Sequence, residues 1–251
     1  MTGAWTPEPP IRRVAVPGGA MLYDASRLSN LDPRWFDPAH WISSGAAEGE
    51  AAGRGRTLFF KSGELRAALR HYYRGGRMAR WLSDRYFFTS AAATRPFSEF
   101  ALTWALYSRG LPVAAPLACR YLRRGNFYTA DLITARLPGS ETLDARLTRE
   151  PLPLSMWIDI GRCIRRFHEV GACHADLNAR NVLLVNGMSI YLIDFDRGRL
   201  RGPGLWRDGN LVRLRRSLLK TTDRLPPGRF SDTDWYSLLA GYRTAPELQR
   251  A

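Results

Sequence analysis

The sequence predicts an α+β fold in two lobes, the first an antiparallel sheet with one helix and the second mainly helical with a hairpin at its centre. Two pairs of short apolar runs are each separated by turn residues, as in β-hairpins. The pairs are 116–121 with 127–134 and 182–185 with 188–193. Apolar residues also recur at helical spacing over 94–109 and 154–170. These patterns together predict an α+β protein.

Length and composition set the limits of this fold. The chain has 251 residues, of which 45% are hydrophobic and 12% aromatic. This length and composition allow a sizeable core and argue against disorder. We expect a single domain with its N-lobe at about 20–135 and its C-lobe at about 136–245, and with residues 1–19 loosely ordered. No basic segment followed by a long apolar run opens the chain, so we expect neither secretion nor a membrane span.

The cysteines predict free thiols. Cys119, Cys163 and Cys173 cannot all pair with one another and lack Cys-x-x-Cys spacing. We therefore expect buried thiols in a reducing compartment. Cys173 beside His174 is a weaker candidate for a ligand or nucleophile, because further ligands at zinc spacing are missing.

The charge predicts an anionic partner. The net charge is +14, and Lys61 and Lys220 are the only lysines, so the excess is almost entirely arginine. Arginine suits phosphate because its planar guanidinium donates paired hydrogen bonds and stays charged. A nucleic acid, an acidic membrane surface or a phosphorylated lipid would each qualify, and charge alone does not choose among them.

The N-terminal third combines loops with two strands. We expect loose extended structure over 2–53 with a short helix near 32–42, and a mobile loop over 43–55. Gly53 and Gly55 end this loop and expose backbone amides that can cover phosphates, although a plain flexible loop fits the same residues.

Arg70 and Glu99 are a candidate ion pair. Strands are expected at 57–60 and 65–73, joined by a turn, and Arg70 lies on the second. It is either a phosphate-binding cation or a solvent-facing strand residue. Glu99 lies in the first turns of the helix at 94–109, where it can pair with Arg70.

Arginines alternate with aromatic residues after this strand, over 70–88, and include Arg74 and Arg77. Such a segment can stack on single-stranded nucleic acid, lie at a bilayer interface, or form a solvated basic helix whose rings pack inward. Because it follows the strand of Arg70 so closely, we favour contact with a phosphorylated acceptor or the membrane that bears it.

The densest pattern is the run His174-Ala175-Asp176-Leu177-Asn178-Ala179-Arg180-Asn181, followed after a hairpin by Asp194-Phe195-Asp196. Asn186-Gly187 supplies the two positive φ angles of a tight turn, so the hairpin returns Asp194 to the side where Asp176 and Asn181 began. Asp194 and Asn181 can then hold Mg²⁺ on nucleotide phosphates while Asp176 accepts and orients the attacking hydroxyl. An ordinary turn before a strand pair is the alternative, and the complete string argues against it. We interpret the run as a kinase active site.

The acceptor is expected not to be a peptide. Beyond Asp196 the chain is rich in arginine, with a helix expected over 210–220. About 55 residues remain, too few for the helical platform on which protein kinases hold peptides. Residues 135–139 are expected to link the lobes, where backbone groups would meet adenine.

The sequence resembles the lipopolysaccharide kinase family, most closely its 3-deoxy-D-manno-octulosonic acid (Kdo) kinases, over about residues 23–242. The resemblance is carried by Leu69-Arg70-His71-Tyr72-Tyr73-Arg74-Gly75-Gly76, Gly110-Leu111-Pro112-Val113, the run from His174 to Asn181, Leu192-Ile193-Asp194-Phe195-Asp196, and Asn210-Leu211 through Arg213-Leu214 to Arg216-Ser217. It implies a small protein-kinase-like fold that acts peripherally at the cytoplasmic face of a Gram-negative inner membrane. The implied reaction transfers the γ-phosphate of ATP, with Mg²⁺, to the 4-OH of Kdo on a lipid A precursor (Kdo-lipid IVA).

The resemblance also implies residue roles. Asp176 is the catalytic residue, Asn181 and Asp194 bind magnesium, and Arg70 with Glu99 replaces the usual lysine–glutamate pair at the nucleotide. Asp196 and Asn178 depart from the glycine and lysine common in protein kinases, and Arg180 is the candidate for the missing cation.

Two alternatives remain open at this point. One is an inner-core heptose kinase of the same family. The other is a catalytically inactive module that binds anionic lipid or nucleic acid; since the magnesium ligands are intact, we expect no nucleic-acid partner.

Overall fold

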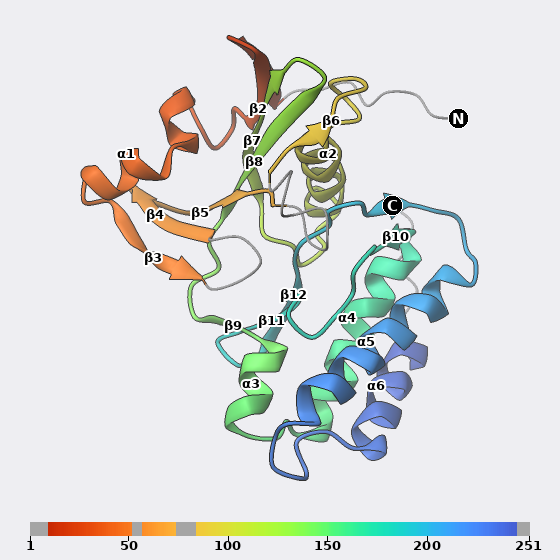
Figure 1. Cartoon of the computed structure of the whole chain (residues 1–251). Helices are drawn as coiled ribbons and strands as arrows, with labels where there is room; N and C mark the ends of the chain where they lie inside the picture. Colours follow the sequence, from red (N-terminus) through yellow and green to blue (C-terminus); the bar gives the residue numbers. More distant parts are fainter. Residues whose placement is uncertain (1–9, 52–56, 74–83, 245–251) are drawn as a thin grey trace. The chain divides into compact units, whose positions relative to one another are not determined.

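The fold is taken from a computed structural model, which describes residues 10–51, 57–73 and 84–244 (Figure 1). The chain divides into two compact units. Unit 1 spans residues 1–104 and 115–136, and unit 2 spans 105–114 and 137–251. The mixture of an antiparallel sheet and helices confirms the predicted α+β class.

Unit 1 is built on an antiparallel sheet in the order β1-β2-β7-β8-β5-β4-β3, with β6 paired to β8. Its strands are β1 (Ile11–Val16), β2 (Gly19–Asp24), β3 (Ala47–Ala51), β4 (Thr57–Ser62), β5 (Leu65–His71), β6 (Tyr86–Phe87), β7 (Pro116–Arg124) and β8 (Phe127–Ala135). The strands predicted over 57–60, 65–73, 116–121 and 127–134 are confirmed as β4, β5, β7 and β8.

Three strands differ from the expectation of loose structure over 2–53, namely β2 and the two edge strands β1 and β3. β1 occupies part of the segment expected to be loosely ordered, and β3 lies within the expected loop at 43–55. β1 is mostly exposed and β3 has the sequence Ala-Glu-Gly-Glu-Ala, so neither shows the alternation of apolar and polar residues that reveals a half-buried strand. Pairing with β2 and β4 forms both strands.

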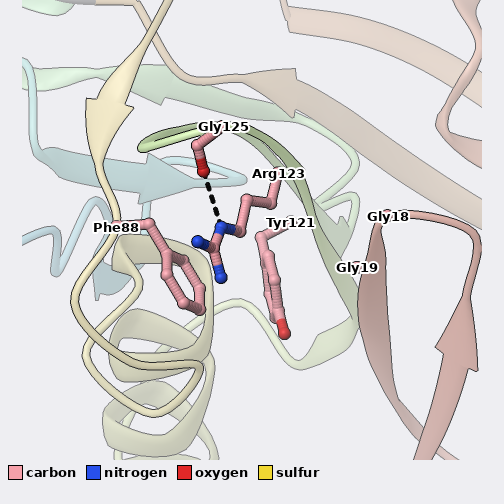
Figure 2. Close-up of a pocket in the computed structure, with 6 residues that line it drawn as sticks. All are labelled: Gly18, Gly19, Phe88, Tyr121, Arg123 and Gly125. Atoms are coloured by element: carbon pink, nitrogen blue, oxygen red, sulfur yellow. Dashed lines mark hydrogen bonds between the residues drawn. The ribbon is translucent and has the colours of Figure 1, made fainter.

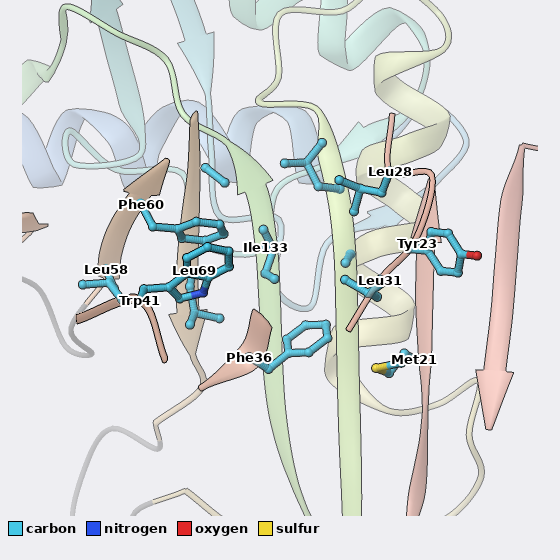
Figure 3. Packing of buried hydrophobic residues seen from close by; sticks show 13 residues of the cluster. Met21, Tyr23, Leu28, Leu31, Phe36, Trp41, Leu58, Phe60, Leu69 and Ile133 are labelled. Carbon is cyan, nitrogen blue, oxygen red and sulfur yellow. The ribbon is translucent and has the colours of Figure 1, made fainter. Parts of the chain in front are cut away.

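The two faces of this sheet bury separate apolar clusters. On one face, η1 (Pro33–Phe36) and α1 (Pro38–Ser43) bring Phe36 and Trp41 onto the strands. Figure 3 shows Trp41 over Phe60, with ring centroids 3.9 Å apart and nearly parallel planes. On the other face, α2 (Arg95–Tyr107) packs Phe97 and Phe100 into a cluster that includes Leu132. The helix predicted near 32–42 is confirmed as η1 and α1.

The two short helices η1 and α1 begin directly after an aspartate at the N-cap position. Asp32 and Asp37 each accept a hydrogen bond from the backbone amide two residues further on, at 2.8 and 2.9 Å. Pro33 and Pro38 follow directly, at positions where a missing N–H costs nothing.

Unit 2 is mainly helical. Its elements are β9 (Ser140–Thr142), α3 (Leu143–Arg149), α4 (Leu154–Glu169), β10 (Ala172–Cys173), β11 (Val182–Val185), β12 (Ser189–Leu192), β13 (Arg199–Leu200), α5 (Trp206–Thr222) and α6 (Asp232–Thr244). The helices predicted over 154–170 and 210–220 are confirmed as α4 and α5, whereas α3 and α6 were not predicted.

Glycines allow α4 and α6 to approach closely. A Cβ at Gly161 would lie 2.0 Å from the carbonyl oxygen of Leu238, and one at Gly241 would lie 2.0 Å from that of Ile158. Next to this contact the buried His168 bonds through Nδ1 to the hydroxyl of Tyr242, at 2.8 Å. The pair of helices therefore forms a rigid base for the loop that follows α4.

The predicted hairpin is confirmed. β11 and β12 pair antiparallel, and Asn186 and Gly187 between them have φ values of 51° and 69°. Both central residues thus adopt the left-handed conformation that the tight turn requires. β11 also pairs with β9 on its other edge, which fixes the hairpin within unit 2.

The cysteines are free thiols, as predicted. Cys119 and Cys163 are buried and Cys173 is half-buried. Burial raises the pKa of the Cys163 thiol to about 12, so this thiol stays protonated at neutral pH.

None of the helices within residues 10–51, 57–73 and 84–244 combines the length and the apolar character of a membrane-spanning helix.

Candidate active site

The run from His174 to Asn181 forms a tightly bonded loop between β10 and β11. The carbonyl oxygen of Asp176 accepts hydrogen bonds from Nδ2 of Asn178 and Nδ2 of Asn181, each at 2.9 Å. The backbone of Asp176 is thereby fixed, while its side chain is 53% exposed. The loop thus exposes the Asp176 carboxylate to solvent on a fixed backbone. A residue that binds an incoming hydroxyl needs this exposure.

His174 joins this loop to the segment that carries Asp194. Its buried ring accepts at Nδ1 from the backbone N–H of Asp176, at 3.1 Å, and donates from Nε2 to the carbonyl of Ile193, at 2.9 Å. These roles require a neutral imidazole with its proton on Nε2. Asn210 of α5 in turn bonds both backbone groups of His174, at 3.2 and 2.8 Å.

Burial dominates the titration of His174. Loss of hydration lowers its pKa, and although the Ile193 hydrogen bond and the charges of Asp194 and Asp176 oppose this effect, the pKa stays below the ordinary value. Burial likewise lowers the pKa of His168 to about 4. Both rings are neutral when the protein is folded near neutral pH.

We expect these two histidines to make the folded protein less stable in acid. Between an unfolded pKa of about 6.5 and the lower folded value, the unfolded chain binds protons that the folded chain does not. The free energy of unfolding therefore falls as pH falls through this window, by up to about 1.4 kcal/mol per pH unit for each histidine.

The contribution is measured as a difference between variants. Denaturant unfolding at several pH values between about 7 and 4.5 should show a smaller acid-induced loss for His168→Gln than for the unaltered protein. His40→Gln is the matched control and should keep the original slope. An unchanged slope in His168→Gln would contradict the assignment.

The pKa of His71 is shifted in the opposite direction. Burial lowers this pKa, but the hydrogen bond to Asp131 and the charges of Asp131 and Asp84 outweigh burial and raise it above the ordinary value.

Asn181 and Asp194 carry oxygen atoms that could hold a hard cation. The backbone N–H of Ile193 donates to the carbonyl of Asn181, at 3.1 Å, so the residue before Asp194 is tied to Asn181. Asn181 is buried, and its Nδ2 bond to the loop turns Oδ1 the other way. Asp194 has a φ of 63°, a left-handed conformation that Asp tolerates better than most residues. Amide and carboxylate oxygens are the donors that Mg²⁺ prefers.

The described residues contain no group of three or more His, Cys, Asp or Glu side chains arranged for a metal ion. A magnesium ion held by Asn181 and Asp194 would take its other ligands from phosphate and water in the usual arrangement for this ion at nucleotides.

Two arginines make charged contacts at this loop, and one of them is the predicted cation Arg180. Nε of Arg180 lies 3.0 Å from Oδ2 of Asp144, on α3. Asn178 uses Oδ1 to accept from the backbone N–H of Arg180, at 2.9 Å, so it shapes the loop and supplies no charge. Arg213 of α5 contacts Asp176, with Nη1 3.9 Å from Oδ1.

One face of α5 supports the whole loop. Asn210 holds His174, Arg213 reaches Asp176, and Oγ of Ser217 accepts from the backbone N–H of Ala179, at 3.1 Å. These residues were predicted as part of a helix and as one of the blocks that carry the family resemblance, without individual roles. Their spacing of three and four residues places them on one side of a helix, and that spacing was the signal in the sequence.

The predicted contact between Arg70 and Glu99 is confirmed in unit 1. Nη2 of Arg70 lies 2.7 and 2.6 Å from the two carboxylate oxygens of Glu99, and the Tyr72 hydroxyl donates to the same group at 2.5 Å. Glu99 is 3% exposed. The Glu99 carboxylate thus holds the Arg70 guanidinium on the face of the sheet that α2 covers. Such an ion pair can position a cation that binds phosphate.

We expect Glu99→Gln to lower the free energy of unfolding by about 3 kcal/mol, because it leaves the partly buried Arg70 without its counter-charge. Tyr72→Phe removes one hydrogen bond to that carboxylate and should cost less, about 1.5 kcal/mol. Denaturant titration of both variants measures this order. A cost below about 1 kcal/mol for Glu99→Gln would show that the ion pair contributes little to stability.

Four predicted site residues lie outside the described residues. They are Gly53, Gly55, Arg74 and Arg77.

A surface pocket of about 460 Å³ also occurs in unit 1. It is lined by Gly18, Gly19, Phe88, Tyr121, Arg123 and Gly125. Figure 2 shows the guanidinium of Arg123 between two aromatic rings, with Nε donating to the carbonyl of Gly125 at 2.6 Å. None of the predicted catalytic, metal-binding or nucleotide-binding residues lines this pocket, and Phe88 is the last residue of the arginine–aromatic segment over 70–88.

The bonded loop with Asp176 and Asn181, the hairpin that leads to Asp194, and the strand–helix pair of Arg70 with Glu99 define a protein-kinase-like phosphotransferase. Residues 39–242 match the lipopolysaccharide kinase (Kdo/WaaP) family. The chain belongs to this family, and membership of a kinase family implies that it uses ATP.

Three relatives named 3-deoxy-D-manno-octulosonic acid kinase illustrate the similarity. The protein of Actinobacillus succinogenes is 42% identical over 218 residues, which cover 84% of this chain and 90% of the relative. The protein of Xylella fastidiosa is 46% identical over 203 residues, 80% of this chain and 81% of the relative. The protein of Haemophilus influenzae Rd is 36% identical over 230 residues, 88% and 95% of the two chains.

Proposed function

We propose that the protein transfers the γ-phosphate of ATP to the 4-OH of Kdo on a Kdo-bearing lipid A precursor, Kdo-lipid IVA, in the synthesis of the lipopolysaccharide inner core. The observation that carries the proposal is the loop in which the Asp176 carboxylate is exposed on a backbone fixed by Asn178 and Asn181. The names of the relatives support Kdo as the sugar.

The residues of unit 2 divide the chemistry between them. Asp176 accepts the hydrogen bond of the sugar hydroxyl, orients it toward the γ-phosphate and takes its proton as the new bond forms. Asn181 and Asp194 would hold Mg²⁺, which neutralises charge on the nucleotide phosphates. His174 contributes no proton at neutral pH, because burial keeps it neutral, and it holds the backbone of Asp176 and Ile193 at a fixed separation.

The proposal extends to the membrane. The acceptor is a lipid, so we place the enzyme peripherally at the cytoplasmic face of the inner membrane, with anionic lipid as a second partner. The net charge of +14 supports this placement. Arg74 and Arg77 are proposed to contact acceptor phosphates or the bilayer, and we expect no nucleic-acid partner.

Phosphate transfer from labelled ATP tests the reaction. The assay compares Kdo-lipid IVA with lipid IVA that lacks Kdo, with Mg²⁺ and at matched detergent. Label should appear only on the Kdo-bearing lipid, and mass spectrometry should locate it on Kdo. Label on heptose of a longer acceptor would support an inner-core heptose kinase. Failure to bind ATP, together with tight and salt-sensitive binding of nucleic acid, would reject catalysis in favour of an inactive binding module.

A further inference from the structure

An exposed row of apolar side chains runs along α5. Leu205, Val212 and Leu219 are 86%, 56% and 51% exposed. Leu205, at the N-cap, has φ −60° and ψ −12°, so helical geometry already holds there. Residues seven apart on a helix are offset by only about 20°, and the three side chains therefore lie nearly in line. Single exposed apolar residues are ordinary, whereas an aligned row points to a binding surface.

Basic residues border this row. Arg213, Arg216 and Lys220 are exposed on α5, at helical positions beside the row. The acidic residues nearby, Asp208 and Asp223, lie toward the two ends of the helix. Arg213 also approaches Asp176, with 3.9 Å between Nη1 and Oδ1, so the basic border is next to the catalytic loop.

The helix cannot turn to hide the row. Its opposite side is buried through Leu211, Leu214 and Leu218 and bonded to the loop through Asn210. Figure 1 shows α5 lying along the body of unit 2. Turning the helix would exchange one set of apolar side chains for another and would break both hydrogen bonds between Asn210 and the backbone of His174.

We propose that this α5 surface, formed by Leu205, Val212, Leu219, Arg213, Arg216 and Lys220, docks onto the interface of an anionic lipid bilayer. Apolar side chains enter the boundary between headgroups and acyl chains, and the neighbouring basic groups reach the lipid phosphates. A nucleic acid would use the basic groups only, because aliphatic side chains offer no ring on which bases stack. The inference rests on the proposed function in one respect, in that docking here presents a membrane-borne sugar to Asp176.

Vesicle sedimentation of the full chain tests the surface without acceptor or ATP. One set of vesicles is phosphatidylcholine, and a second contains about one third phosphatidylglycerol. Leu205→Ser/Val212→Ser/Leu219→Ser is compared with a control triple on other elements, Ile42→Ser/Leu154→Ser/Met188→Ser, whose side chains are similarly exposed. Arg216→Gln/Lys220→Gln is compared with Arg12→Gln/Arg13→Gln. Arg213 is left unaltered because it contacts Asp176.

The unaltered protein should bind the anionic vesicles, and salt should weaken the binding. The apolar triple and the Arg216/Lys220 pair should each bind about tenfold more weakly, and both controls should bind like the unaltered protein. An alanine version of the triple keeps helix propensity and should show the same loss. The triple should still phosphorylate a detergent-dispersed acceptor.

Two outcomes would overturn the inference. The first is equal loss in test and control variants. The second is no vesicle binding by the unaltered protein, including the case in which it binds single-stranded nucleic acid instead. Because these vesicles contain no substrate, a failure of the proposed reaction would appear only in the phosphate-transfer assay and not here.

Discussion

Replacing Asp176 by Asn should lower turnover by about 10²–10⁴-fold, the usual contribution of a positioned acid–base group. The amide keeps the size of the side chain but no longer accepts the proton of the sugar hydroxyl. The fold should not change, because the loop is held through the backbone N–H and carbonyl of Asp176. Steady-state transfer from labelled ATP to Kdo-lipid IVA, with thermal unfolding of the same preparation, measures both expectations.

The Arg213 contact sharpens this test. At 3.9 Å from the Asp176 carboxylate, Arg213 is expected to be released by the substitution, which changes local charge but no buried contact. Asp223→Asn, which removes another exposed carboxylate of unit 2, is the control and should retain full turnover. Near-normal turnover in a folded Asp176→Asn protein would remove Asp176 from the mechanism.

The loop and hairpin could be predicted because their causes are local. Asn186-Gly187 selects the turn, the apolar runs on each side select the strands, and the two together return Asp194 toward Asn181. The pairing of Arg70 with Glu99 was predictable for a different reason. It spans 29 residues and was predicted by analogy with the lysine–glutamate pair of kinases, once the strand and the helix had been placed.

The support from α5 was not predicted, because it depends on contacts distant in sequence. Asn210 lies 36 residues from His174, and Ser217 lies 38 residues from Ala179. The helix pattern indicates that α5 exists but not which loop it contacts. The same limit applies to the ion pair of Arg180, whose partner Asp144 is 36 residues away on a helix that was not predicted. The role of Arg180 at the γ-phosphate stays a prediction.

Replacing Asp194 by Asn should lower turnover by about 10²-fold or more, because one of the two protein ligands proposed for Mg²⁺ loses its charge. The concentration of Mg²⁺ that gives half-maximal rate should rise as well. Asn tolerates the left-handed φ of 63° that Asp194 adopts, so the backbone should stay in place. Transfer rates measured across a Mg²⁺ titration, beside thermal unfolding, follow both quantities.

Two further substitutions separate the backbone of Asp194 from its chemistry. Asp194→Gly relieves the left-handed conformation, whereas Asp194→Ala retains it at a cost of about 1–2 kcal/mol. We therefore expect Asp194→Gly to be more stable than Asp194→Ala. Both variants lack the carboxylate, so both should lose turnover to a similar extent. Turnover that instead followed stability would show that Asp194 acts through the fold. Unchanged Mg²⁺ dependence in a stable Asp194→Asn protein would place the metal on other ligands, because loss of the charge of a metal ligand weakens the binding of the metal.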